Sequence, residues 1–163
     1  MIFITLGSQK FQFDRLLKAI DDLIEKGVII ESTFAQSGYS DYKPLNYSYK
    51  AFLNRDEFTE TMQKAEMVIT HGGTGAIIGA VKKGKRVIAV PRLAKYGEHV
   101  DDHQLQLIRQ FDEMNIIYPC YELENLEDAV KETRVRMFNR IRQKSPILYR
   151  WVMNAVRYEG YRW

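Results

Sequence analysis

A glycine-rich stretch at residues 68–84 constrains the fold of this chain more than any other part of the sequence. An apolar run at residues 67–69 precedes it, and apolar residues at helical spacing follow the turn Thr-His-Gly-Gly-Thr-Gly. This order is typical of a buried strand, a tight turn and a helix, with Thr74 as the predicted cap and Gly84 as the predicted stop. Such a turn points backbone N–H groups, at the positive end of a helix dipole, toward open space, where phosphate is the usual ligand. Alternatively, the glycines serve only the dihedral angles of the turn.

Strand and helix patterns alternate along the chain. Apolar runs predict strands at residues 2–6, 28–36, 47–53, 67–69, 86–90 and 115–118. Amphipathic or capped segments predict helices at residues 14–26, 55–65, 101–113 and 125–143, besides the helix that ends at Gly84. This alternation predicts an α/β fold, a Rossmann-like parallel sheet with helices on both faces.

The length and composition of the chain exclude several classes of protein. Its 163 residues are enough for one domain with a substantial core. No apolar run approaches the ~20 residues of a membrane span, and the N-terminus lacks the features of a signal peptide. Cys120 is the single cysteine, so an internal disulfide is impossible. We therefore expect a cytoplasmic protein.

Basic residues concentrate at the end of the chain. Residues 134–163 hold eight Lys and Arg but one acidic residue, Glu159, while the whole chain has a net charge of +3. We predict a basic amphipathic helix at residues 144–163, following an α/β domain at residues 1–143. Such a helix favours contact with an anionic partner or surface, unless it packs on its own domain. No nucleic-acid-binding module is recognisable.

Four loops follow the carboxyl ends of predicted strands, where ligands bind in this class of fold. Gly7 and Ser8 follow the first strand, and Phe52 and Leu53 close the third. The glycine turn follows the central strand, and residues 91–104 follow the next one. Because all four meet at one edge of the sheet, they predict a single site.

A dinucleotide site is one alternative. Gly73, Gly75 and Gly79 look like a loose dinucleotide-binding turn, but the first strand carries no such motif and no acidic residue ends the strand after the turn. The sequence GxxxxGK[ST] does not occur, which argues against a P-loop phosphotransferase.

A metal site is a second alternative. His99, Asp101, Asp102 and His103 are residue types that bind zinc. However, they straddle the predicted start of a helix, and no further cluster of ligands accompanies them. We therefore predict no metal.

Three motifs occur in a characteristic order and spacing. They are Gly7-Ser8-Gln9, Ile69-Thr70-His71-Gly72-Gly73-Thr74-Gly75 and Asp102-His103-Gln104. With these motifs, residues 1–120 resemble the C-terminal half of GT-B glycosyltransferases similar to the peptidoglycan N-acetylglucosaminyltransferase, which form glycosyltransferase family 28. The chain looks like the split enzymes of that family. Its segment 91–104 looks most like that of bacterial capsular and exopolysaccharide galactosyltransferase catalytic subunits.

The resemblance implies a role for each matching residue. The diphosphate of a UDP-sugar would be held by Gly7, Ser8, His71, Gly72, Gly73, Thr74 and Gly75. The uracil would be flanked by Phe52 and Leu53, and the sugar hydroxyls would bond to Asp102, His103 and Gln104. Family members often carry a ribose-binding Glu where this chain has Gly79, so the ribose contact must differ here.

The resemblance also implies a partner, because a complete GT-B enzyme has two such domains. Residues 1–143 would bind the nucleotide sugar, and the helix at residues 144–163 would dock on a membrane-anchored acceptor-binding subunit. This would place the protein at the inner face of the plasma membrane.

The implied reaction is inverting transfer of galactose or N-acetylglucosamine from a UDP-sugar to a lipid diphosphate-linked saccharide, in capsule or exopolysaccharide biosynthesis. No cofactor or metal would be needed, because helix dipoles and N–H groups stabilise the leaving UDP. The base would be His99, Glu98 or a group of the partner.

Two other functions stay open. The chain could be a non-catalytic accessory subunit that binds a nucleotide sugar. It could also be a sugar-nucleotide epimerase, although epimerases carry both halves in one longer chain.

Overall fold

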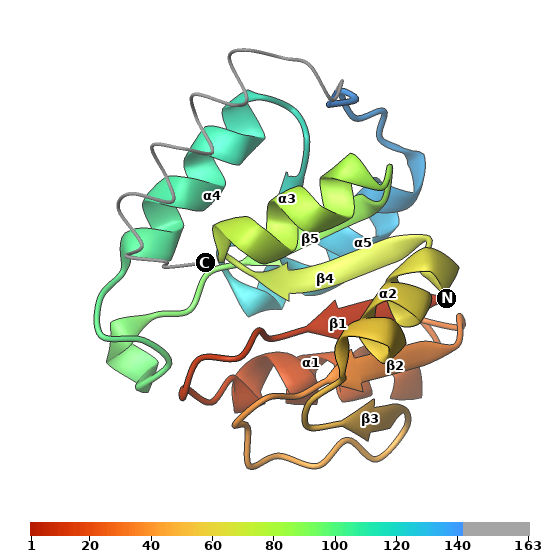
Figure 1. Ribbon diagram of the computed structural model, residues 1–163, viewed down its shortest axis with the longest axis vertical. Helices are drawn as coiled ribbons and strands as arrows, with labels where there is room; N and C mark the ends of the chain where they lie inside the picture. The colour runs from red at the N-terminus through yellow and green to blue at the C-terminus, as the bar shows by residue number, and fades with distance from the viewer. Residues whose placement is uncertain (142–163) are drawn as a thin grey trace.

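The computed structural model describes residues 1–141 of the chain. The helix predicted for residues 144–163 lies outside the described residues. Within the described part, one sheet of parallel strands has the order β3-β2-β1-β4-β5-β6 (Figure 1). This arrangement confirms the prediction of a Rossmann-like α/β fold.

Strands and helices alternate as the sequence predicts. The strands are β1 (Ile2–Thr5), β2 (Thr33–Gln36), β3 (Ser48–Lys50), β4 (Met67–His71), β5 (Arg86–Val90) and β6 (Tyr118–Pro119). The α-helices are α1 (Asp14–Glu25), α2 (Arg55–Lys64), α3 (Thr74–Lys82), α4 (His103–Glu113) and α5 (Leu126–Val135). Short 3₁₀ helices, η1 (Ala94–Tyr96) and η2 (Leu123–Asn125), lie in loops.

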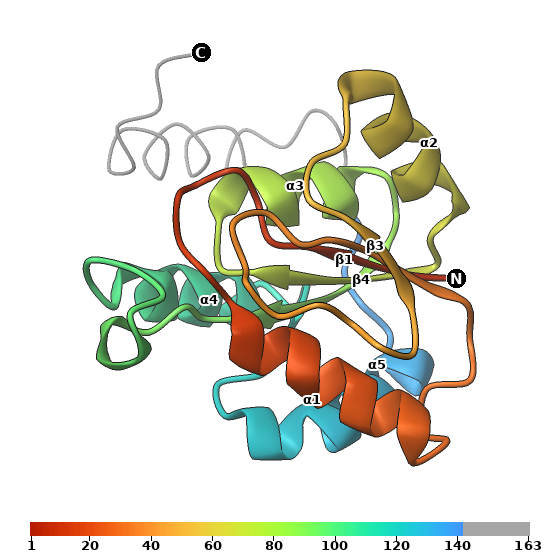
Figure 2. The ribbon, with the colours of Figure 1, turned by 90° about the horizontal axis from the view of Figure 1, so that it is seen from below.

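Helices cover both faces of the sheet (Figure 2). Side chains alternate between the faces along each strand, so Ile2 and Ile4 of β1 enter one core and Phe3 enters the other. The first core lies under α1 and α5, and the second lies under α2, α3 and α4. Because β1 and β4 are buried on both faces, their sequences are continuous apolar runs.

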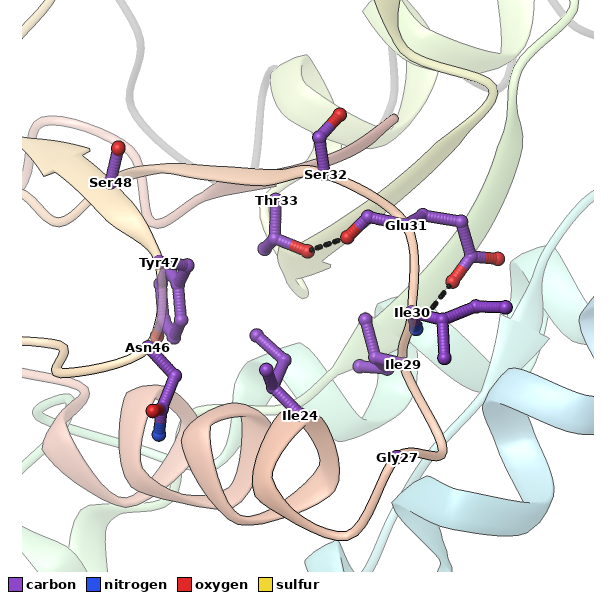
Figure 3. A pocket seen from close by; sticks show the side chains of 10 residues that line it. All are labelled: Ile24, Gly27, Ile29, Ile30, Glu31, Ser32, Thr33, Asn46, Tyr47 and Ser48. Carbon is purple, nitrogen blue, oxygen red and sulfur yellow. Dashed lines mark hydrogen bonds between the residues drawn. The ribbon is translucent and has the colours of Figure 1, made fainter.

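The strand predicted at residues 28–36 is too long, since β2 has only four residues. The backbone N–H groups of Val28 and Ile29 both donate to the carbonyl of Leu23 and so finish the end of α1. Ile29 is buried against that end, whereas Ile30 is 85% exposed. The apolar run therefore caps a helix before the strand begins. Figure 3 shows Ile24 of α1 and Ile29 on the wall of the hollow that results.

The helix predicted at residues 125–143 is also too long, because α5 ends at Val135. Arg136 has extended backbone, and its guanidinium donates to the side-chain oxygen of Asn115. The N–H of Asn139 donates to the carbonyl of Asn115. This segment thus turns back to the loop after α4. In the same way, β3 keeps three residues of the strand predicted at 47–53, and β6 shares only Tyr118 with the strand predicted at 115–118.

The helices of residues 1–141 include none whose length and apolar character would allow it to cross a membrane.

The parallel arrangement sends the loops after β1, β2, β3, β4 and β5 to one edge of the sheet. The site residues predicted from the sequence lie in these loops or at the helix starts that follow them, except His71, which ends β4.

Candidate functional site

The centre of the candidate site is the point where the strand order of the sheet reverses. β1 and β4 are neighbours there, with Thr5 beside Thr70 in the register. The chain leaves β1 toward α1 on one face and leaves β4 toward α3 on the other. Such a divergence opens a crevice at the carboxyl ends of the strands, and Gly7 and Gly73 lie on its two sides.

The imidazole of His71 fills the space between these two glycines. An added Cβ would lie 2.8 Å from His71 Cε1 if it were at Gly7, and 2.3 Å from His71 Nε2 if it were at Gly73. Gly7 also has a positive φ of 72°. Two of the glycines are therefore required by their contact with His71, in addition to any ligand.

His71 is buried and neutral. Its Nδ1 lies 3.3 Å from the hydroxyl oxygen of Thr70, which donates its own hydrogen to the carbonyl of Thr5. This assigns the hydrogen to Nδ1 and leaves the lone pair on Nε2, which faces Gly73. Burial, aided by the nearby Arg92 guanidinium, lowers the pKa of His71 to about 3. A neutral ring with this tautomer supports the turn, and it supplies no positive charge to a phosphate.

Helix α3 begins directly after Gly73 and presents N–H groups to the crevice. The first intrahelical bond runs from the N–H of Ile77 to the carbonyl of Gly73. The N–H groups of residues 74–76 precede that bond, as in every helix start. Gly73, and not Thr74 as predicted, is the N-cap, and the Thr74 hydroxyl is buried with no hydrogen-bond partner among residues 1–141. A Cβ at Gly75 would meet nothing within 4 Å, so this helix start is open.

Gln104 connects the glycine turn to the loop after β5. Its Oε1 accepts from the N–H of Gly72 at 3.0 Å and from the N–H of Arg92 at 2.9 Å. The side chain is almost fully buried. Its oxygen therefore has a structural role, and its amide nitrogen is the group left to meet a ligand.

Glu98, one of the two predicted bases, is enclosed by the same loop. Its side chain is 1% exposed, and its carboxylate accepts hydrogen bonds from the guanidinium of Arg15 and from the N–H of Leu93. A paired and buried carboxylate has no access to an acceptor hydroxyl. This geometry favours a structural role for Glu98.

His99, the other predicted base, lies closer to the surface. Its Nδ1 lies 3.1 Å from the carboxylate of Asp101, and its side chain is 16% exposed. The ring also packs at a tilt against Phe11, which follows the Gly7 turn, with centroids 5.1 Å apart. Nδ1 lies within reach of both the carboxylate and the backbone N–H of Asp101, so this residue orients the ring, and Nε2 accepts a proton in the tautomer that carries the ring hydrogen on Nδ1.

The carboxylates of the two acidic residues after His99 both accept backbone N–H groups. Asp101 accepts the N–H of His103, the first residue of α4, and this bond is the main reason that its pKa is lowered. Asp102 accepts the N–H of Ala94. In the described range, residues 1–141, no three His, Cys, Asp or Glu side chains are grouped to hold a metal ion.

An exposed aromatic pair borders the site on the side of β2 and β3. Tyr39 and Phe52 are 46% and 41% exposed, and their rings meet edge to face with centroids 5.0 Å apart. The N–H of Leu53 is already bonded to Gln36 Oε1, so of its backbone groups only the carbonyl is left for a nucleobase. Tyr39 was not among the predicted residues, because a tyrosine in a loop carries no periodic signal.

The aromatic pair is fixed next to the Gly7 turn. The N–H of Gly38 donates to the carbonyl of Ala51, which ties the segment before Tyr39 to the segment before Phe52. A Cβ at Gly38 would lie 3.1 Å from the carbonyl oxygen of Gly7. A ligand that bound phosphate at the crevice would therefore find two aromatic rings beside it.

Two hollows lined by described residues lie outside the candidate site. One of about 550 Å³ is at the opposite edge of the sheet, between the end of α1 and the starts of β2 and β3 (Figure 3). Another of about 480 Å³ is lined by the end of α3, the start of β5 and residues 136–141. Neither contains a residue of the predicted site.

Comparisons with known proteins match one family over most of the chain. Residues 1–145 match the model of the glycosyltransferase family 28 C-terminal domain. The UDP-N-acetylglucosamine transferase subunit ALG13 of Candida albicans is 31% identical over 100 residues, which are 58% of this chain and 31% of the relative. The human protein of the same name is 28% identical over 131 residues, which are 73% of this chain and 11% of the relative. The chain thus spans less than a third of either relative.

Solved structures show the fold. The glycosyltransferase of kitacinnamycin superimposes with a TM-score of 0.61 at 16% identity, and the calicheamicin glycosyltransferase CalG4 with 0.58 at 14%. Each match covers 96% of this chain and 38% of the other. The chain therefore has the fold of one half of a GT-B glycosyltransferase.

The contact between Gly73 and His71 predicts a sharp difference between neighbouring glycines. Gly73→Ala drives a Cβ into the buried ring and should lower the free energy of unfolding by about 1–3 kcal/mol. Gly75→Ala meets open space within a helix and should leave it unchanged or raise it by up to about 1 kcal/mol. Urea unfolding of both variants measures this, and equal losses would contradict the packing described.

The pKa of His71 predicts a loss of stability in acid. Folding lowers this pKa from 6.5 to about 3, so the unfolded chain binds the proton more tightly. Its contribution is complete above pH 6.5 and is lost as the pH falls from 6.5 toward 3. Between pH 7 and pH 5 we expect the wild type to lose about 2 kcal/mol more than His71→Gln. Urea unfolding of both proteins at each pH measures this difference. If both lose the same stability between pH 7 and pH 5, folding does not lower the pKa of His71 and the prediction is wrong.

Proposed function

Because this chain belongs to glycosyltransferase family 28 through that family's C-terminal domain, we propose that it binds the UDP-sugar donor of an inverting glycosyltransferase. The single observation that carries this proposal is the open start of α3 beside Gly7, at the reversal of the strand order. Helix N-termini at this position favour phosphate groups through their N–H groups and their dipole. The diphosphate would lie across Gly7, Ser8 and residues 72–75.

The nucleobase would lie on the aromatic pair of Tyr39 and Phe52. Both rings are exposed, and their backbone is tied together beside the diphosphate position. Uracil offers a flat face for stacking, which contributes about 1–3 kcal/mol per base in other proteins. The carbonyl of Leu53 would meet the edge of the base. The sequence lacks the family's ribose-binding Glu, so the ribose would depend on these neighbouring contacts.

The donor sugar would lie toward the start of α4, against Asp102, His103 and the amide nitrogen of Gln104. The relatives are named UDP-N-acetylglucosamine transferase subunits, which supports N-acetylglucosamine as the sugar. The resemblance of residues 91–104 to capsular enzymes supports galactose. Either sugar would be transferred to a lipid diphosphate-linked saccharide in capsule or exopolysaccharide biosynthesis.

The chemistry would be a displacement at C1 of the sugar. A base removes the proton of the acceptor hydroxyl, its oxygen forms the new bond to C1, and UDP leaves with the electron pair of the old bond. His99, oriented by Asp101, is the base that this chain offers, although the partner could supply it. The start of α3 would stabilise the charge on UDP without a metal or other cofactor.

A second subunit would provide the acceptor site. The relatives are named as subunits, and the solved structures contain more than twice the length of chain that matches here. The partner would be anchored in the membrane and would hold this chain at its inner, cytoplasmic face. No contact with nucleic acid is proposed. If the chain instead served as an accessory subunit, it would bind the donor without contributing to catalysis.

The open helix start predicts where UDP binding fails. Gly75→Val should weaken UDP about tenfold or more, because its branched side chain fills the approach of the phosphates. Lys82→Val is the matched control, since Lys82 is exposed in the last turn of the same helix, away from its start. Calorimetry on both folded variants tests this. Equal UDP affinities would remove the diphosphate from this position.

The aromatic pair predicts a loss that is specific for the nucleobase. Tyr39→Ala should lower the affinity for UDP by about tenfold, and Tyr39→Phe should retain it, because stacking needs the ring alone. Tyr49→Ala is the control, since Tyr49 is 40% exposed on β3 but is not in the pair. If the Tyr39 and Tyr49 variants bind UDP equally well, the base lies elsewhere.

The transfer reaction predicts a dependence on a partner and none on metal. The chain with its membrane partner should transfer sugar from a UDP-sugar in excess EDTA, and His99→Ala should reduce the rate by about 10²-fold or more if His99 is the base. An inactive His99→Ala that still binds UDP separates catalysis from binding. Full activity of this variant would assign the base to the partner. A strict requirement for Mg²⁺ or Mn²⁺ would contradict the proposed stabilisation of UDP.

A further inference from the structure

Arg92 is the largest of the fully buried side chains, at 1% exposure. Its Nη2 donates to the carbonyl of Leu6 at 2.6 Å, and its Nη1 donates to the carbonyls of Phe11 at 2.9 Å and Glu98 at 3.3 Å. The guanidinium also packs on the ring of Phe13, 5.3 Å from its centroid. One side chain thus satisfies three backbone carbonyls in a place closed to water.

These carbonyls belong to two loops that are not neighbours in the sheet. Leu6 and Phe11 flank the Gly7 turn after β1, whereas Glu98 lies in the loop after β5. β4 separates the two strands, so the Arg92 side chain must span the end of β4, close to His71. The effect of its charge on the pKa of His71 agrees with this position.

The loop after β5 is held to Arg92 and its surroundings by two more buried side chains. Glu98 binds the N–H of Leu93 and the guanidinium of Arg15, which itself donates to the carbonyl of Pro91. Gln104 joins the backbone of Arg92 to the glycine turn. The three sides of the crevice are therefore connected from within.

We propose that Arg92 is a positioning residue that fixes the sugar side of the donor site relative to its diphosphate side. This inference rests on the proposed function. The bond that breaks joins the diphosphate, held at Gly7 and α3, to the sugar, held at the start of α4. Its alignment depends on the distance between these loops, and a misplacement of about 1 Å can cost a factor of about 100 in rate. A planar guanidinium with several fixed donors sets such a distance, whereas the single ammonium of lysine does not.

The test compares two ligands on the full chain. In Arg92→Lys, the affinity for UDP-N-acetylglucosamine or UDP-galactose, whichever the wild type prefers, should fall about tenfold or more. The affinity for UDP should change by less than about threefold, because β1–β4 pairing and His71 still hold the diphosphate side. A loss of stability alone does not produce a difference between the two ligands.

Arg134→Lys is the matched control. The guanidinium of Arg134 joins α5 to the loop before β2, where it donates to the carbonyl of Val28 and the carboxylate of Glu31. This contact lies at the other end of the strands from the candidate site. This variant should lose some stability and bind both ligands as the wild type does. Glu98→Gln is the second variant, which loosens the same loop from its other contact and should show the same difference between ligands if Arg92→Lys does not fold.

The outcomes are separable. If the wild type binds neither UDP nor a UDP-sugar, the proposed function fails. If the wild type binds both, and Arg92→Lys weakens them equally or not at all, the proposed function stands and the role of Arg92 is refuted; Glu98→Gln decides in the same way if Arg92→Lys does not fold.

Discussion

The candidate site depends on the packing of one neutral imidazole between two glycines. His71 ends the central strand, and its ring occupies the volume that a side chain at Gly7 or Gly73 would need. The contact brings the turn after β1 and the turn after β4 together on either side of the crevice. Because Gly73 is the N-cap of α3, the same contact also sets where this helix starts. The proposed anion site is thus a product of core packing, and the N–H groups at the surface only complete it.

Buried polar side chains extend this order to the outer loops. Loops usually derive little rigidity from backbone pairing, and those around a binding site still need fixed positions. Here Arg92, Glu98 and Gln104 bind backbone groups of the loops after β1, β4 and β5. Each satisfied group is buried, so breaking one contact leaves others without a partner. A network of this kind makes the three loops behave as one unit.

The sequence predicts the centre of the fold better than its margins. Strands β1, β4 and β5 follow from apolar runs, because both faces of a central parallel strand are buried. The run at residues 28–30 misleads, since apolar side chains that cover a helix end look the same as those of a strand. Glu98 shows the limit for the site. An acidic residue in a loop reads as a candidate base, and its partner Arg15 is 83 residues away, where no local pattern can reveal it.

The contact of His71 with its two glycines also bears on how such sequences can diverge. A larger residue at position 7 or 73 is incompatible with an imidazole at position 71, while a smaller residue at 71 would leave a void beneath the turn. Single exchanges at any of the three positions are therefore costly, and a compensated exchange is open only to positions 71 and 73, because Gly7 also needs its positive φ. Homologous chains should accordingly vary at these positions in concert, with a side chain appearing at 73 only where position 71 has become small.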